Sequence, residues 1–276
     1  MFGPLREVLV NAPGIKFAGA FDMPEHGYRH PVDLDLAEKE HREFVELLKS
    51  LGANVHLLDD QESGPDALYQ YDPSLITRNG AILLRSGKPT RRGEEVVQAA
   101  WYRANDIPIV GRIEAPGTVD GGDVFWLDQE TLCVGRTLRT NDAGISQLAT
   151  LVEEEVHVFD MPYDAGPDEC LHLLSVISPV DANLAVAELD RMPVGLYQLC
   201  VDRQVELIPV PREEISTLGC NVLAIAPRVA VMVEGNPVTQ DRMTSAGVEV
   251  HTFAGTEICL NGSGGPTCLT RPIRRN

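Results

Sequence analysis

A single cysteine, Cys268, follows a glycine-rich segment close to the end of the chain. Residues 262–267 are Gly-Ser-Gly-Gly-Pro-Thr, so the thiol stands among residues that contribute little packing. Free cysteines are usually buried as small apolar side chains, whereas the backbone amides of a glycine-rich loop can approach an anion such as a thiolate. Cys268 is therefore a candidate nucleophile, and we expect the chain to supply a proton-transferring group and a carboxylate beside it.

Side chains that could assist a thiol recur at the entrances of successive predicted β-hairpins. A histidine can act as general acid and base, and carboxylates can orient it or bind a cation. The residues at these entrances are Asp66, Asp72, Asp120, Asp123, His172, Cys220 and Asn221, while Cys268 lies on the last predicted strand. A Cys-His-carboxylate set at one position of a repeated unit favours catalysis over a purely structural role.

Each of these residues also has a structural interpretation. The run Asp-Gly-Gly-Asp at 120–123 is typical of a tight turn, and a lone histidine such as His172 on an apolar strand is often a hydrogen-bonded core residue. Cys170 and His172 lie two residues apart and could bind zinc together with Cys268, but this set lacks a clear fourth ligand. We therefore expect no metal and no cofactor. For Cys220, both assistance to the nucleophile and simple packing remain open.

The elements that must position these residues repeat at intervals of roughly fifty residues. Hairpins are predicted at 74–85, 123–135, 171–187 and 221–234. The helices that follow them are predicted at 94–105, 141–155, 194–204 and 238–246. The strands that follow these helices are predicted at 107–113, 156–159, 205–210 and 248–253. Near the start of the chain, a fifth unit consists of a strand at 6–10, a helix at 36–51 and a strand at 54–58.

This fifth unit lacks one strand, which the extreme C-terminus can supply beside residues 6–10. Such pairing would close the chain into a ring and remove the sheet edges. We therefore predict an α/β fold, a five-bladed propeller of ββαβ units. An open α/β sheet with right-handed crossovers is the alternative. Nucleotide binding is not expected, because no GxGxxG follows the first strand and residues 262–267 lack the Gly-Lys-Ser/Thr ending of a P-loop.

The composition is that of an acidic globular protein. The 276 residues are 43% hydrophobic and 23% charged, which is enough to bury a large core. A formal net charge of -18 argues against nucleic-acid and membrane partners. The chain has no apolar run of about 18 residues, no secretory-signal layout at its start, and six scattered cysteines without a CxxC pair. We expect a cytoplasmic protein with reduced thiols.

Three motifs, in this order, resemble those of the guanidino-group-modifying enzymes, and the resemblance extends over nearly the whole chain. Residues 112–123 (Arg-Ile-Glu-Ala-Pro-Gly-Thr-Val-Asp-Gly-Gly-Asp) resemble the acidic motif, residues 171–173 the histidine strand and residues 264–268 the nucleophile loop. The family includes arginine deiminase, the amidinotransferases and dimethylarginine dimethylaminohydrolase, to which the chain is most similar. The resemblance implies one catalytic domain over residues 1–276, a five-bladed ring of ββαβ units around a central site.

The resemblance also implies the catalytic roles. Cys268 would be the nucleophile, His172 the general acid and then the general base, and Asp120 the carboxylate that orients the histidine. Asp66 and Asp72 match positions that contact the guanidinium group. The implied mechanism forms a thiouronium on the cysteine, which water then converts to a ureido product.

Further positions bear on the substrate. Arg91 and Arg139 match family positions that bind a substrate carboxylate, although without the resemblance they could be a solvated loop residue and a basic residue before a helix. Tyr71 replaces an acidic residue of the dimethylarginine enzymes. Because its hydroxyl group donates as well as accepts, we expect a less charged group, such as the ureido group of citrulline, or a different N-substituent. Residues 13–32 are either a lid over the pocket or a surface loop.

Together, these features predict a hydrolase that cleaves a C–N bond of a guanidino or ureido amino acid and yields a citrulline-type product and an amine. The alternatives are a hydrolase of citrulline or another guanidino acid, an amidinotransferase that admits an amine instead of water, and a non-catalytic five-fold binding module. The expected partner is a small-molecule substrate, with no nucleic acid and no membrane. A homodimer is compatible with the sequence.

Overall fold

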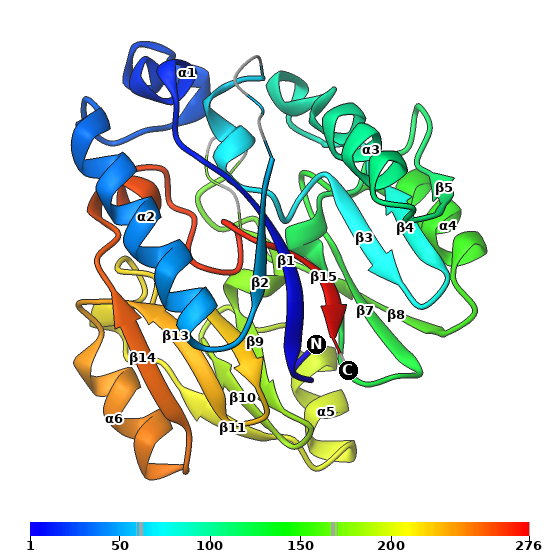
Figure 1. Ribbon diagram of the computed structural model, residues 1–276. Helices are drawn as coiled ribbons and strands as arrows, with labels where there is room; N and C mark the ends of the chain where they lie inside the picture. The colour runs from blue at the N-terminus through cyan, green and yellow to red at the C-terminus, as the bar shows by residue number, and fades with distance from the viewer. Residues whose placement is uncertain (59, 61–62, 167–168, 170, 276) are drawn as a thin grey trace.

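The strands of this protein form five three-stranded sheets (Figure 1). The computed structural model describes residues 1–58, 60, 63–166, 169 and 171–275. In each sheet an antiparallel pair of strands is followed by a helix and then by a third strand parallel to the second. The repeated hairpin, helix and strand predicted from the sequence are thus confirmed.

Four of the sheets are built from consecutive segments of the chain. The first contains β3 (Ser74–Thr77), β4 (Gly80–Leu83), α3 (Glu94–Ala104) and β5 (Ile109–Arg112). The second contains β6 (Val124–Trp126), β7 (Thr131–Arg136), α4 (Asp142–Leu151) and β8 (Glu155–Asp160). The third contains β9 (Ile177–Asp181), β10 (Leu184–Ala187), α5 (Val194–Asp202) and β11 (Glu206–Pro209). The fourth contains β12 (Val222–Ala226), β13 (Val229–Val233), α6 (Pro237–Ser245) and β14 (Glu249–Phe253).

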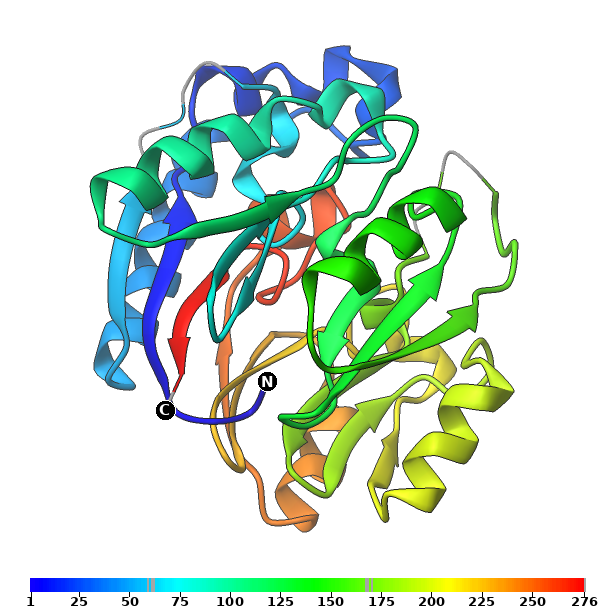
Figure 2. The same ribbon diagram turned by 90° about the vertical axis from the view of Figure 1, so that its right-hand side faces the viewer.

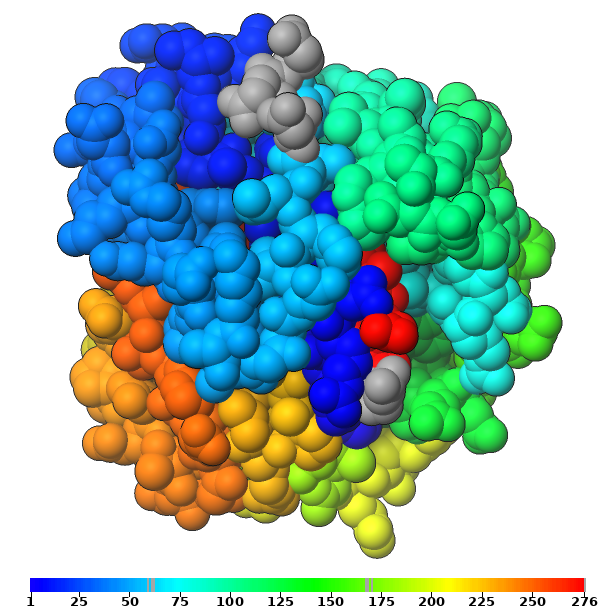
Figure 3. All heavy atoms as spheres, viewed as in Figure 1, coloured from blue at the N-terminus to red at the C-terminus, as the bar shows by residue number. Residues whose placement is uncertain are grey.

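The fifth sheet joins the two ends of the chain. It contains β1 (Leu5–Asn11), α2 (Leu34–Ser50) and β2 (Asn54–Leu58), and its third strand is β15 (Arg271–Arg275). The C-terminal strand is antiparallel to β1, with Leu9 opposite Arg271 and Val8 opposite Pro272. The two strands reach the surface side by side in the space-filling view (Figure 3). The pairing predicted for residues 6–10 with the C-terminus is confirmed.

The long helices lie on the outside of the sheets, and the apolar core lies beneath them (Figure 2). Helix α2 begins at Asp33, whose side chain accepts a hydrogen bond from the backbone N–H of Leu36 at 3.0 Å. Phe44 and Leu48 of this helix are fully buried, and the ring of Phe44 packs on that of Phe253 at the end of β14. Short apolar strands such as β10, all four residues of which are buried, fill the interior.

Short helical turns connect these elements and carry much of the site described below. They are α1 (Ile15–Ala18), η1 (Ala20–Asp22), η2 (Pro24–His26), η3 (Pro65–Leu68), η4 (Pro89–Arg91), η5 (Gly121–Asp123), η6 (Leu173–Ser175), η7 (Arg212–Glu214) and the π-helix η8 (Thr256–Asn261). Within the described ranges, no helix is both long enough and apolar enough to cross a lipid bilayer.

Two predicted elements differ from the structure. The strand expected from residue 171 begins only at Ile177, because the chain first forms η6, and the hairpin turn falls at residues 182–183 instead of 179–181. The helix expected to reach residue 155 ends at Leu151. Residue 152 is extended and Glu155 already pairs with Thr131 in the sheet, so pairing with β7 overrides the helical preference of the glutamates.

Candidate active site

The loop that carries Cys268 is held in place by helix α2. Glu40 lies on the buried face of α2. Its carboxylate accepts hydrogen bonds from the backbone N–H groups of Thr256, Glu257 and Ile258 at 2.8 to 3.2 Å. These donors lie in the first turn of η8, where helical N–H groups have no partner within the helix. The glycine-rich segment that follows is therefore anchored at its start.

Cys268 lies in a turn in which the N–H of Leu269 donates to the carbonyl oxygen of Gly265 at 3.1 Å. Its sulfur accepts a hydrogen bond from Nδ2 of Asn221 at 3.3 Å. Oδ1 of the same amide accepts a hydrogen bond from the backbone N–H of Thr267 at 3.1 Å. Gly265 packs so closely on Asn221 that a Cβ atom there would lie 2.5 Å from Cγ of the amide. Asn221 was noted in the sequence only as a residue at a hairpin entrance, and the structure shows that it positions the thiol.

His172 stands directly before η6, not on a strand as predicted. The N–H of Leu173 donates to Oδ1 of the buried Asp123 at 3.1 Å, and this contact holds the turn that presents the histidine. A Cβ atom on Gly122 would lie 2.2 Å from Nδ1 of His172, so only a glycine allows this approach. The second aspartate of the Asp-Gly-Gly-Asp motif thus supports the histidine through the backbone.

Asp120 faces His172 from the other end of the same motif. Its Oδ2 atom lies 3.4 Å from Nε2 of His172 and 3.5 Å from Nη1 of Arg139, and its Oδ1 accepts the N–H of Gly87 at 2.8 Å. Burial by itself raises the pKa of this carboxyl, but the hydrogen bond and charge of His172, with the charges of Arg91 and Arg139, lower it to about 2. Asp120 is therefore an anion that can orient the imidazole of His172 and stabilise its protonated form.

Asp72 completes this group of acids. Its Oδ1 atom accepts the N–H of Gly122 at 2.7 Å, and its Oδ2 atom pairs with Arg91. Asp72, Asp120 and His172 each place one polar atom within 4.8 Å of the others, a spacing that could also surround a metal ion. Because both carboxylates already bind cationic side chains or backbone donors, the arrangement suits proton transfer and recognition of a polar substrate.

Arg91 is buried and binds several groups of the protein. The side chain is only 6% exposed, and its donors bind Asp72, both oxygens of Glu94, and the carbonyl oxygens of Tyr69 and Asp66. A guanidinium group has five N–H donors, so few remain for a substrate carboxylate. Arg91 is thus an internal counter-ion of Asp72 in this structure, and its binding of a substrate carboxylate stays a prediction. Arg139 is more exposed and faces Asp120.

Asp66 lies on η3 and binds two groups through a single oxygen. Its Oδ2 atom is 2.6 Å from Nζ of Lys88 and 2.8 Å from Nδ1 of His26. Burial raises the pKa of Asp66, but these two partners and the charge of Arg91 outweigh it and hold the pKa well below its usual range. The sequence predicted Asp66 as a site residue and missed both of its partners.

Tyr71 lies outside the group of acids around His172. The Cζ atom of Arg271 lies 3.9 Å from the centre of the Tyr71 ring. The Tyr71 hydroxyl points to the sulfur of Met1 at 3.9 Å. Both Tyr71 and Asp72 lie in the turn that leads into β3. A contact between the Tyr71 hydroxyl and the substrate stays a prediction.

The two other cysteines singled out in the sequence have different outcomes. Cys220 is buried, its sulfur lies 3.8 Å from the carbonyl oxygen of Val186, and burial raises its pKa to about 12. Such a thiol is protonated and packs, which decides between the two interpretations left open. Cys170, part of the alternative zinc set, lies outside the described residues.

The segment at residues 13–32 packs against the site instead of projecting from it. His26 reaches Asp66, and the N–H groups of Arg29 and His30 donate to Oδ1 of Asn261 at 3.0 and 3.1 Å. Phe17 packs edge-on against Tyr28. The segment is therefore bound both to η3 and to the π-helix that leads to Cys268; its opening as a lid stays a prediction.

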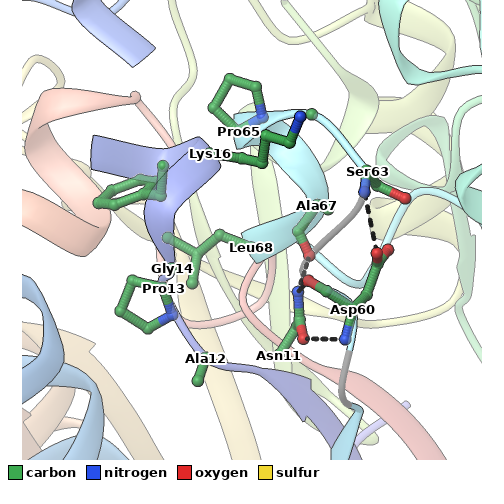
Figure 4. A pocket seen from close by; sticks show the side chains of 12 residues that line it. Asn11, Ala12, Pro13, Gly14, Lys16, Asp60, Ser63, Pro65, Ala67 and Leu68 are labelled. Carbon is green, nitrogen blue, oxygen red and sulfur yellow. Dashed lines mark hydrogen bonds between the residues drawn. The ribbon is translucent and has the colours of Figure 1, made fainter. Parts of the chain in front are cut away.

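Two cavities border these residues. One, of about 280 Å³, is lined by Arg136, Arg139, Tyr163 and Leu171, among others, and so adjoins the neighbours of both Asp120 and His172. The other, of about 10 Å³, lies between η3 and the start of α1, where the Asn11 amide links Asp60 to Ala67 (Figure 4). A space of that size holds about one water molecule, so only the larger cavity could take part of a substrate.

Electrostatics set the protonation of the Cys268 thiol. Burial raises the pKa of the Cys268 thiol, and the nearby charge of Asp72 raises it further, while the Asn221 hydrogen bond and the charge of His172 lower it. The net direction is upward, so the thiol is protonated until a positive charge approaches it. A cationic substrate or a protonated His172 would supply that charge.

The sequence matches the profile of one protein family along almost its whole length. The profile described as eukaryotic N,N-dimethylarginine dimethylhydrolase covers residues 26–275. The chain belongs to this family. Membership in the dimethylarginine dimethylhydrolase family confirms the resemblance drawn from the acidic, histidine and cysteine motifs, and places the chain among hydrolases that act on amidine C–N bonds.

Curated relatives of this dimethylarginine dimethylhydrolase family member include two bacterial enzymes. N(G),N(G)-dimethylarginine dimethylaminohydrolase of Streptomyces coelicolor is 28% identical over 279 residues, which cover 98% of both chains. The enzyme of the same name from Pseudomonas aeruginosa is 27% identical over 242 residues, covering 86% of this chain and 89% of the relative.

Solved structures share the fold of the family member. A mutant of the Pseudomonas aeruginosa enzyme in complex with citrulline superimposes with a TM-score of 0.80 at 24% identity, covering 97% of this chain and 98% of that one. The N-terminal domain of a cyanobacterial arginine dihydrolase, bound to its product, superimposes with a TM-score of 0.85 at 18% identity and covers 98% and 97% of the two chains. At this level of identity the likeness shows the mixed α/β fold.

Proposed function

We propose that this protein hydrolyses a C–N bond of a guanidino or ureido amino acid through a covalent intermediate on Cys268. The observation that carries the proposal is that Asp72, Asp120 and His172 come together from separate parts of the chain, and that the charges of Asp72 and His172 act on the Cys268 thiol. The substrates printed in the names of the relatives, dimethylarginine and arginine, support the same class of reaction. The cavity beside Arg139 offers space for the remainder of such a molecule.

In the first step, the Cys268 thiolate attacks the central carbon of the guanidino group and forms a C–S bond. The C–N bond to the amine breaks, and the amine leaves with a proton from His172. A thiouronium remains on the enzyme. Asp120 holds the imidazole in place and stabilises its protonated form, as a buried carboxylate next to a histidine does in other hydrolases.

In the second step, neutral His172 accepts a proton from water, and the oxygen attacks the same carbon. The C–S bond breaks, the thiolate is restored and a ureido product is released. His172 takes one of the two protons of the water molecule, and the other is released to solvent as the C–S bond breaks. The same imidazole thus gives a proton to the departing amine in the first step and accepts one from water in the second. A substrate cation beside Cys268 opposes the effect of burial on the thiol and favours the thiolate when the site is occupied.

The proposal includes a closed ring formed by the whole chain as one catalytic domain. Hairpin strands of neighbouring sheets contact one another, as β9 does β12, β12 does β1, and β15 does β3. These contacts, together with the pairing of β1 and β15, support a five-bladed propeller around the residues of the site. Closure would explain why residues distant in the sequence face one another.

Substitution of the nucleophile tests the proposed function. We expect Cys268→Ser to lose at least about a thousandfold in turnover of dimethylarginine, arginine or citrulline, because a hydroxyl is a far weaker nucleophile than a thiolate. Ureido product and released amine would be followed by mass spectrometry. Cys200→Ala, at a buried cysteine of α5, is the control for losing a thiol elsewhere. Equal turnover in Cys268→Ser and the natural protein would refute the nucleophile.

A further inference from the structure

Lys88 brings a positive charge next to Asp66, a residue predicted to contact the substrate. Its ammonium lies 2.6 Å from Oδ2 of Asp66 and 3.3 Å from the carbonyl oxygen of His26. The side chains of Lys88, Asp66 and His26 are 14%, 7% and 4% exposed, so the pair is largely shielded from water. An ion pair in such surroundings is screened far less than one on the surface.

The backbone around Lys88 fixes this charge beside the reacting groups. Gly87, the preceding residue, donates its N–H to Asp120 at 2.8 Å, and a Cβ atom on Gly87 would lie 2.2 Å from the carbonyl oxygen of Arg139. The N–H of Lys88 itself donates to Oγ of Ser86 at 3.1 Å. The same short segment thus positions both the carboxylate that faces His172 and the ammonium that binds Asp66.

Each carboxylate expected to bind a guanidinium group already has a cation of the protein as its partner. Arg91 pairs with Asp72, and Lys88 pairs with Asp66. Arg91 is enclosed by several acceptors, whereas Lys88 has two acceptors among the described residues and carries three N–H donors. Lys88 is therefore the cation that can also donate to a bound molecule.

A guanidinium and a ureido group differ in what they offer to Lys88. The guanidinium has only donors and a positive charge, so it repels the ammonium and must compete with it for Asp66. The ureido group is uncharged, donates through N–H and accepts through its carbonyl oxygen. It can bind Asp66 and Lys88 together, so the ion pair need not be broken.

We propose that Lys88 is a specificity-determining residue, which makes this site prefer an uncharged ureido group over a cationic guanidinium group. The inference rests on the proposed function, because it assumes that Asp66 faces the reacting group. It does not depend on the Tyr71 hydroxyl, which points to the sulfur of Met1. Lys88 acts by neutralising Asp66 and by donating to the ureido oxygen.

Binding by an inactive protein tests this preference separately from turnover. L-Arginine and L-citrulline differ at one atom, an imino nitrogen against an oxygen, and would be titrated calorimetrically into Cys268→Ser. Adding Lys88→Met to that background should strengthen arginine binding relative to citrulline binding on the order of tenfold, the size expected for one charge-assisted contact. Lys88→Arg, which keeps the cation, should leave the ratio close to that of the parent.

Two further variants show whether the effect passes through Asp66. In Asp66→Asn, Lys88→Met should change the ratio by a smaller factor than it does when Asp66 is present, because the neutralised carboxylate is gone while donation to the ureido oxygen remains. Lys39→Met removes an exposed lysine of α2 and should change nothing. Thermal unfolding of every variant confirms that it is folded.

The outcomes separate the two proposals. If both ligands bind and Lys88→Met changes their affinities by the same factor, or weakens arginine more than citrulline, the role of Lys88 is refuted while the proposed function stands. If neither ligand binds the folded Cys268→Ser protein, the proposed substrate class is refuted, and the inference about Lys88 falls with it.

Discussion

Asp120 and Asp123 are separated by two glycines and are both fully buried, yet their pKa values move in opposite directions. Burial raises the pKa of Asp123 to about 6, since its hydrogen-bond donors, the hydroxyls of Thr137 and Thr140 and the N–H of Leu173, are neutral. At Asp120 burial also raises the pKa, but His172 and the nearby arginines lower it by more. One motif therefore supplies a strongly acidic carboxyl to the histidine, and a carboxyl that burial makes easier to protonate to the backbone that holds it.

The raised pKa of Asp123 predicts a pH dependence of stability. A carboxyl whose pKa is higher in the folded than in the unfolded protein stabilises the fold at low pH, and this contribution is lost as the pH rises through the folded value. The shift of roughly two pH units corresponds to about 3 kcal/mol. The free energy of unfolding of the natural protein, minus that of Asp123→Asn, should fall by about this amount from about pH 4 to pH 7.

Urea unfolding at a series of pH values measures this difference. The amide of Asn has nearly the shape of the carboxyl and does not titrate, so the variant removes the linkage with little change in packing. Asp241→Asn, at an exposed position of α6, is the control and should show no such trend. A difference that is constant or rises with pH would contradict the assignment.

At the scale of elements, the site depends on short helical turns and on the side chains that hold their ends. Glu40 of α2 binds the start of η8, and Asp123 holds η6. Both carboxylates satisfy N–H groups that a helical turn leaves without internal partners. The regular helices and strands form the frame, while these contacts place Cys268 and His172 within it.

Glu40 should therefore affect both stability and catalysis. Glu40→Gln keeps one acceptor oxygen where the carboxylate used two, so at least one buried N–H of η8 loses its partner. We expect a loss of about 1 to 3 kcal/mol in the free energy of unfolding, together with lower turnover because η8 leads to the Cys268 loop. Chemical unfolding and steady-state kinetics measure the two effects.

Glu43→Gln is the matched control on the same helix. The side chain of Glu43 is 56% exposed and pairs only with Lys39, so its removal should cost little. If Glu40→Gln proved as stable and as active as Glu43→Gln, the anchoring role of Glu40 would be wrong.

At the scale of the whole molecule, the side chain of Arg271 links the C-terminal strand to the start of β3. This residue begins β15, is 3% exposed, and donates from Nη1 to the carbonyl oxygens of Tyr71 and Ser74. Its guanidinium also lies over the ring of Tyr71. The C-terminal strand is thus bound to β1 through its backbone and to the entrance of β3 through one side chain.

Loss of this side chain should weaken the entire fold. We expect Arg271→Met to lower the free energy of unfolding by about 2 to 4 kcal/mol, because two buried carbonyl oxygens lose a charged donor. Equilibrium unfolding in urea is the measurement. Arg274→Met removes an exposed arginine of the same strand, whose pairing with Glu7 is solvated, and should cost less than about 1 kcal/mol. Similar effects for the two variants would argue against Arg271 as the link between β15 and the entrance of β3.

The sequence alone determined the repeated unit and the pairing of the last strand with the first, and it indicated the thiol, histidine and carboxylates as candidates for the site. These features depend on local patterns: alternating and helical apolar spacing, turn residues, and polar residues at equivalent positions of a repeat. The family resemblance drawn from Asp120, His172 and Cys268 was confirmed for the same reason, since each motif is a short contiguous run.

Only the tertiary structure decided which charges meet. Lys88 and His26 lie 22 and 40 residues from Asp66, and no local pattern connects them with it. Arg91 became an internal counter-ion and Tyr71 a partner of Arg271, because side-chain direction and burial depend on which segments pack against each loop. Ion pairs and hydrogen bonds between distant segments arise from the packing of the sheets, so their chemistry becomes visible only when the chain is folded.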